Sequence, residues 1–169
     1  VEAMSQLGGG STHKGTIPSK SLKYSIHLLA QVKNQFHFSP NHEIHTVNYP
    51  DLLQNAASVI EKQVKMRESF YERNGIKIFF GRAEFIDEHR LRIRQYDGME
   101  EEVTAESIVI ATGSRPYHPP NVDFSHPLVH DSDSILSLDK KPKSVTVYGA
   151  GVIGSEYASI FRDLGIKVN

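Results

Sequence analysis

The chain of 169 residues contains no cysteine. This absence excludes disulfide bonds, thiol nucleophiles, iron–sulfur ligation and cysteine-bound zinc, and it suits a protein of the reducing cytoplasm. The chain also lacks a large net charge, because 19 basic and 20 acidic residues give a formal net charge of −1. No apolar run approaches the roughly 20 residues that a membrane span requires. The composition therefore predicts a soluble globular protein, and we expect neither a nucleic-acid partner nor a membrane partner.

Two segments carry the periodicity of amphipathic helices. The first follows Pro18, which suits a first helical turn or kinks a helix begun at Ser11, and its apolar face holds Leu22, Ile26, Leu29 and Val32. The second runs from about Tyr49 to Asn74, where Asn-Gly closes it, and its apolar face holds Leu52, Leu53, Ala56, Val59, Ile60, Val64 and Phe70. A polar loop over 37–50 separates them. His42 and His45 of this loop lack the H-E-x-x-H spacing, so we predict no metal site there.

The residue pattern in the middle of the chain is typical of β-strands. Short β-rich runs are separated by turn residues, at 76–80, 83–87, 90–95, 101–104 and 106–111. The pattern predicts a small antiparallel meander that leads into a buried strand, "SIVIATG". Residues 114–142 hold five of the eight prolines and read as a linker, in which "DSDSILSL" caps one helical turn.

The last segment, "KSVTVYGAGVIGSEYASIFRDLGIKVN", predicts a strand, a tight glycine turn, a helix and the start of another strand. The turn is the G-x-G-x-x-G motif of Gly149, Gly151 and Gly154. In this context its glycines permit a tight turn, approach of a pyrophosphate and close packing of the helix on the strand, with the helix N-terminus facing the phosphates. The alternative is a glycine turn of another α/β unit. The residue that chooses NAD or NADP is expected beyond Asn169.

The stretch "GGGSTHKGTIPSK" (8–20) places three glycines ahead of a helix. Backbone amides without Cβ atoms can close on an anion or on a planar ring. A flexible loop is the alternative, but it does not explain the Ile-Pro-Ser-Lys that follows. "ATGSRP" (111–116) ends a β-branched run, where open α/β sheets place ligands, although alone it equally fits an ordinary turn.

Five stretches in this order carry a family resemblance: "LGGGSTHKGTIPSKSL", "GRAEFIDEH", "IATGSRPYHP", "DSDSILSL" and "YGAGVIGSEYASIF". Over nearly its whole length the chain resembles the flavoprotein disulfide reductase superfamily, and within it the transhydrogenases. The resemblance implies an α/β fold. Part of an FAD-binding Rossmann-like domain with an antiparallel meander (1–137, its N-terminal βα unit absent) would precede a linker (138–142). The first βαβ of an inserted NAD(P)-binding Rossmann domain (143–169, truncated) would follow.

The same resemblance implies a function. Disulfide reductases carry their redox cysteines at the positions of Ser11 and Thr16, and this chain keeps neither sulfur. The expected activity is therefore hydride transfer between NADPH and NAD through FAD, by a cytoplasmic protein that is at least a dimer when full length. Two alternatives stay open: a flavin-dependent disulfide or metal-ion reductase with a cysteine pair elsewhere, and an inactive piece that holds half of each nucleotide site.

The resemblance also assigns site residues. Lys20 would lie beside flavin N5 and pair with Glu156, where its ammonium favours the negative charge of the reduced ring; we expect the two groups within about 4 Å. A solvated lysine is the alternative. Many relatives have a gating tyrosine at the position of Val152, and valine cannot stack as that lid. The predicted cofactor-binding residues are Glu2, which would bind the adenosine ribose, Gly8, Gly9, Gly10, Ser11, Thr12, Thr16, Lys20, Arg82, Ala83, Thr112, Gly113, Gly149, Gly151, Val152, Ile153 and Gly154.

Overall fold

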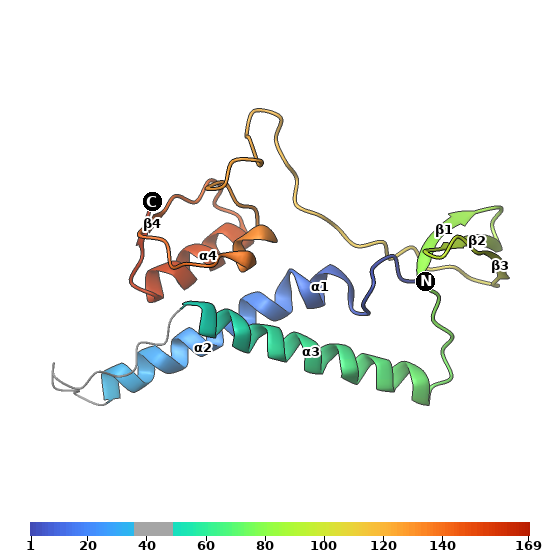
Figure 1. Cartoon of the computed structure of the whole chain (residues 1–169), viewed down its shortest axis with the longest axis horizontal. Helices are drawn as coiled ribbons and strands as arrows, with labels where there is room; N and C mark the ends of the chain where they lie inside the picture. Colours follow the sequence, from blue (N-terminus) through green and yellow to red (C-terminus); the bar gives the residue numbers. More distant parts are fainter. Residues whose placement is uncertain (36–48) are drawn as a thin grey trace. The chain divides into compact units, whose positions relative to one another are not determined.

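The computed structural model describes residues 1–35 and 49–169, without the side chains of 32–35 (Figure 1). The chain divides into two compact units, one of residues 1–10 and 61–115 and one of residues 11–60 and 116–169. Most of the predicted loop over 37–50, including His42 and His45, lies outside the described residues. The domain boundaries expected at 137 and 142 stay a prediction.

The first unit contains a three-stranded antiparallel meander. Its strands are β1 (Gly81–Phe85), β2 (Arg90–Gln95) and β3 (Glu100–Thr104), in the order β1-β2-β3. Ile93 in the central strand is fully buried. Arg94 of β2 contacts one glutamate on each flanking strand, Glu84 of β1 (3.3 Å) and Glu100 of β3 (2.7 Å). The predicted meander is confirmed, with one apolar and one charged face.

Two predicted strands of this unit do not form. Residues 76–80 contribute a single parallel bridge, in which Phe80 pairs with Glu2. Residues 106–111 adopt no regular structure, and Val109 and Ile110 are exposed. A strand needs lateral hydrogen bonds to a neighbour, and no strand of the described residues pairs with this segment. The prediction of a buried strand at 106–111 is therefore wrong for this structure.

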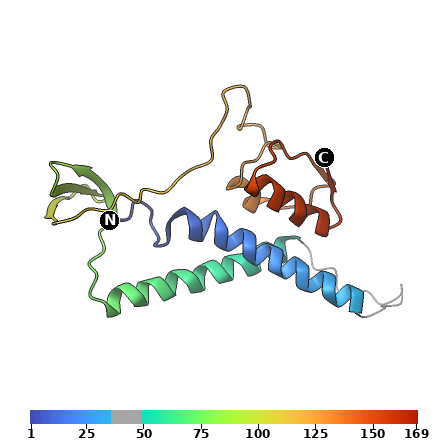
Figure 2. The ribbon, with the colours of Figure 1, turned by 180° about the vertical axis from the view of Figure 1, so that it is seen from behind.

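The second unit is built on α2 (Thr16–Gln35), which follows the short α1 (Gly9–His13). Pro18 is the third residue of α2, within the first turn, where its missing N–H leaves no helical bond unmade. The predicted Leu22 and Ile26 are buried. α3 (Tyr49–Arg73) begins beside α2 (Figure 2). Asn55 Nδ2 of α3 donates to Ser25 Oγ of α2 at 2.9 Å.

The apolar face of α3 was predicted correctly only in part. Leu52, Ala56 and Val64 are buried, whereas Phe70 is exposed. The guanidinium of Arg73, one helical turn on, lies 4.8 Å from the centroid of the Phe70 ring and covers it instead. The helix ends as predicted: Gly75 has φ 63° and the amide of Ile76 donates back to the carbonyl of Tyr71.

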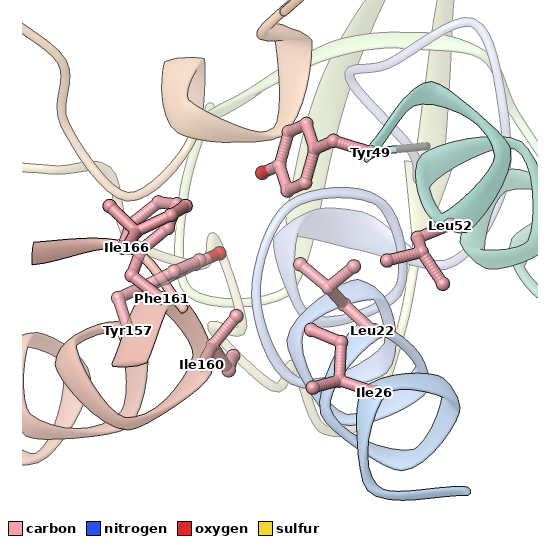
Figure 3. Packing of buried hydrophobic residues seen from close by; sticks show 8 residues of the cluster. All are labelled: Leu22, Ile26, Tyr49, Leu52, Tyr157, Ile160, Phe161 and Ile166. Carbon is pink, nitrogen blue, oxygen red and sulfur yellow. The ribbon is translucent and has the colours of Figure 1, made fainter. Parts of the chain in front are cut away.

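The C-terminal segment forms the predicted βαβ arrangement. β4 (Ser144–Val145) and β5 (Lys167–Val168) pair in parallel, and α4 (Val152–Asp163) connects them. Figure 3 shows the core that joins α4 to α2 and α3. It consists of Leu22, Ile26, Tyr49, Leu52, Tyr157, Ile160, Phe161 and Ile166. This packing lays α4 against α2.

The predicted capped turn in the linker is confirmed as the 3₁₀ helix η1 (Ser134–Ser137). Asp131 supplies the cap: its Oδ1 accepts hydrogen bonds from the amides of Asp133 (3.0 Å) and Ser134 (2.7 Å), and its Oδ2 lies 2.7 Å from His118 Nε2. Burial alone would raise the pKa of the Asp131 carboxyl, but hydrogen bonds from Ser134 and His118 outweigh it and lower the pKa to about 2. Among the described residues no helix is long and apolar enough to cross a membrane.

Asp131→Ala should lower the free energy of unfolding by about 1 kcal/mol at pH 7, because two amides lose their acceptor. The native pKa of about 2 lies below the ~3.9 of an unfolded aspartate. The stabilisation by the ionised carboxylate is therefore complete above about pH 4 and is lost as the pH falls toward 2. Denaturant unfolding at pH 7 and pH 3 should show the gap between wild type and variant shrinking. Asp139→Ala, at an exposed position nearby, is the control; a gap that does not change with pH would contradict this account.

Candidate functional site

Lys20 of α2 and Glu156 of α4 form an ion pair in the second unit. Lys20 Nζ lies 2.5 Å from Glu156 Oε1, and 136 residues separate them. The Lys20 side chain is 61% exposed, whereas that of Glu156 is only 15% exposed. The geometry expected for this pair is confirmed, and the ammonium keeps an open side on which a ligand can lie.

A second residue of α2 reaches the same carboxylate. Ser19 Oγ lies 3.5 Å from Glu156 Oε2 and 3.4 Å from the carbonyl oxygen of Thr16, and Ser19 is buried. Adjacent residues of one helix therefore contact the two oxygens of Glu156. The sequence interpretation did not single out Ser19, although its place beside Lys20 in Ile-Pro-Ser-Lys was the available signal.

Two buried phenols belong to the core next to this pair. Burial raises the pKa of Tyr49 to about 12. Burial also raises the pKa of Tyr157, and the nearby Tyr49 and Glu156 raise it further. Tyr157 Oη donates to the carbonyl of Ser132 at 3.3 Å. Both phenols are neutral at physiological pH, so they add no charge beside Lys20 and Glu156.

The three glycines of the turn before α4 have separate structural reasons. Gly149 has φ 123°, a conformation that L side chains rarely adopt. A Cβ on Gly154 would overlap the carbonyl oxygen of Gly149 and lie 3.3 Å from Val147 Cγ1. Around a Cβ on Gly151, by contrast, no heavy atom lies within 4 Å. Gly149 and Gly154 are therefore required by the fold, whereas Gly151 borders open space.

The N-terminus of α4 is suited to an anion. No side chain caps it at Gly151, so its first amides are not satisfied by a cap, and Val152 and Ile153 in the first turn are exposed. Unpaired amides and the helix dipole together favour a phosphate group.

The glycine stretch before α2 shows comparable freedom. Gly8 has φ 118° and Gly9 has φ 59°, both in the region that glycine adopts readily. A Cβ on Gly10 would lie 3.8 Å from the carbonyl oxygen of Ser114, an ordinary contact. Within the second unit, Ser11 and Thr16 are exposed.

Thr12 is the polar group of this stretch that lacks a partner. Its side chain is fully buried, and its Oγ1 has no hydrogen-bond partner among the described residues. Leaving a buried hydroxyl unpaired costs about 1–3 kcal/mol. The unpaired hydroxyl of Thr12 is therefore a local cost to the stability of this unit.

The remaining predicted residues lie in the first unit. The carboxylate of Glu2 accepts a hydrogen bond from the amide of Met4 at 2.9 Å, and the backbone of Glu2 pairs with the segment before β1. Arg82 and Ala83 are on β1, and Thr112 and Gly113 are in the exposed segment after the meander. These assignments stay predictions.

The donor set fits a flavin and a nicotinamide nucleotide in two respects. The turn at Gly151 leaves room for a pyrophosphate at an uncapped helix end, and the largely exposed Lys20 ammonium offers a positive charge that suits a reduced flavin ring. No group of three His, Asp or Glu able to hold a metal ion occurs in the described parts of the chain.

Comparison with known proteins gives a consistent result. The family model of the pyridine nucleotide-disulphide oxidoreductases matches residues 2–169. Over all 169 residues the chain is 51% identical to the soluble pyridine nucleotide transhydrogenase of Colwellia psychrerythraea and 48% identical to that of Photorhabdus laumondii. It spans 36% of the length of each of these relatives.

Solved structures agree on the fold. The HOCl-induced flavoprotein disulfide reductase RclA from Escherichia coli is 27% identical, with a TM-score of 0.74 over 99% of this chain and 34% of its own. LpdA from Mycobacterium tuberculosis has a TM-score of 0.85 at 24% identity, over 97% of this chain and 36% of its own.

Proposed function

Because the chain belongs to the pyridine nucleotide-disulphide oxidoreductase family, we propose that it is part of an FAD-containing transhydrogenase that moves hydride between NADPH and NAD. One observation carries the proposal: the Lys20–Glu156 ion pair is present in a chain that has hydroxyls, Ser11 and Thr16, where a dithiol relay would need sulfur. The relatives with about 50% identity that are named transhydrogenases support it.

The first part of the proposed site is the flavin side. FAD would be held by the glycine stretch Gly8–Gly10, Ser11, Thr12, Thr16 and Lys20, with Glu2, Arg82, Ala83, Thr112 and Gly113 as further contacts. When bound, the flavin would supply the ring that accepts and returns hydride. The chain's own part is electrostatic: Lys20 presents a fixed positive charge on its exposed side, and Glu156 holds that ammonium charged and aimed.

The second part is the nicotinamide side. Gly149, Gly151 and Gly154 with Val152 and Ile153 would bind the pyrophosphate of NADPH or NAD at the N-terminus of α4. Val152 has no ring with which to stack, so gating of this pocket by the residue at this position is not part of the proposal.

A disulfide reductase activity is less well supported. The hydroxyl groups of Ser11 and Thr16 cannot replace the cysteine pair that alternates between dithiol and disulfide. None of the 169 residues is a cysteine. We further propose that the full-length protein is cytoplasmic, which the lack of cysteine favours, and assembles at least as a dimer, as its superfamily suggests.

The activity test compares two kinds of acceptor. The full-length protein with FAD should transfer hydride from NADPH to an NAD analogue without any dithiol substrate, and thiol-alkylating reagents should leave residues 11 and 16 unmodified. The assay follows analogue reduction spectroscopically. Efficient NAD(P)H-dependent reduction of lipoamide or of glutathione disulfide would contradict the proposal.

A further inference from the structure

The carboxylate of Glu156 is mostly buried, and its exposed partner Lys20 contacts its oxygen Oε1. The other oxygen, Oε2, lies 3.5 Å from Ser19 Oγ. A buried carboxylate oxygen without a donor would lose its hydration uncompensated. Ser19 is therefore in the place where a second donor is needed.

The hydroxyl of Ser19 has two acceptors within reach but only one hydrogen. A serine inside a helix commonly donates to the carbonyl three or four residues back, and here the carbonyl of Thr16 lies 3.4 Å away. The ionised carboxylate of Glu156 competes with that carbonyl. Hydrogen bonds to a charged acceptor are the stronger ones, so donation to Glu156 is favoured.

We propose that Ser19 is a positioning residue that fixes the Glu156 carboxylate, so that Oε1 faces Lys20 and the ammonium is held in one direction. With both oxygens engaged from adjacent positions of α2, rotation of the carboxylate group would break two contacts. With Ser19 removed, rotation breaks only one. The inference rests on the proposed function for its kinetic consequence, but the contact itself does not.

The kinetic test uses the full-length flavoprotein and Ser19→Ala. Rapid mixing with NADPH should show a limiting rate of flavin reduction about fivefold lower, with the apparent nicotinamide Kd unchanged, because one hydrogen bond to the carboxylate is lost. Ser19→Cys keeps the packing volume but has a weak donor and should be slowed likewise. Ser21→Ala, two residues along the same helix, should reduce its flavin at the wild-type rate. An unchanged rate in both Ser19 variants would overturn the inference.

A second readout needs no activity. Thermal unfolding of wild type, Ser19→Ala, Glu156→Ala and the double variant forms a cycle. Ser19→Ala should lower Tm more in the wild-type background than in the Glu156→Ala background, since without the carboxylate the serine returns to the carbonyl of Thr16. Additive changes would show that the two side chains do not interact, and would also overturn the inference. If the wild type failed to transfer hydride while the cycle was non-additive, the proposed function would fall and the contact would stand.

Discussion

Lys20→Met in the full-length protein should retain FAD but slow flavin reduction on the order of a hundredfold, about 2.7 kcal/mol of lost transition-state stabilisation. Methionine keeps the length of the side chain and removes the charge. The ammonium contacts Glu156 at 2.5 Å and is otherwise largely exposed, so its removal opens no cavity in the core, but the mostly buried Glu156 carboxylate loses its cation and the unit loses stability as well. The rate of flavin reduction in the folded, FAD-containing variant therefore reports the effect on the chemistry.

Anaerobic rapid mixing with NADPH measures the rate, and the flavin absorbance of the purified variant measures retention. Lys23→Met is the matched control, because Lys23 is an exposed lysine one turn along α2. It should reduce its flavin at the wild-type rate. Unchanged reduction kinetics in Lys20→Met would remove Lys20 from the mechanism, and loss of FAD would assign it to cofactor binding.

The sequence predicted those helices and strands that depend on interactions between residues close together in the chain. α2, the meander and the βαβ segment follow from periodicity, turn residues and the glycine motif, which can all be read from neighbouring residues of the sequence. The strand expected at 106–111 depends on a partner strand, which no residue pattern inside the segment can reveal. The exposure of Phe70 has a related cause, since Arg73 covers a ring that periodicity alone assigns to the core.

The candidate site shows the same division. Periodicity could not have brought Lys20 to Glu156 across 136 residues, and only the family resemblance did so. The Ser19 contact with Glu156 depends on how α4 packs on α2, and the capping role of Asp131 depends on where its carboxylate turns. The spacing of residues in the sequence predicts neither the packing of helices nor the rotamer of a side chain.

The strongest contrast among the motif glycines should separate folding from binding. Gly154→Ala should lower the free energy of unfolding by about 1–3 kcal/mol, because the new Cβ overlaps the carbonyl oxygen of Gly149 and that backbone must move. Moving the turn should also weaken nicotinamide binding. Gly151→Val meets no atom within 4 Å of its Cβ and needs no unusual backbone angle, since Gly151 has φ −71°. Its thermal stability should therefore match that of the wild type.

Nicotinamide affinity should nevertheless fall in Gly151→Val, because the side chain would occupy the space through which the pyrophosphate approaches the amides at the start of α4. The expected result is a nicotinamide KM at least about tenfold higher, roughly 1.4 kcal/mol, with FAD content unchanged. Tm, flavin absorbance and steady-state KM, measured on both variants in the full-length protein, provide the comparison. Equal loss of FAD and of nicotinamide binding in Gly151→Val would mean that Gly151 is needed for folding and not for the ligand. A lowered Tm in Gly151→Val but not in Gly154→Ala would reverse the roles assigned to the two glycines.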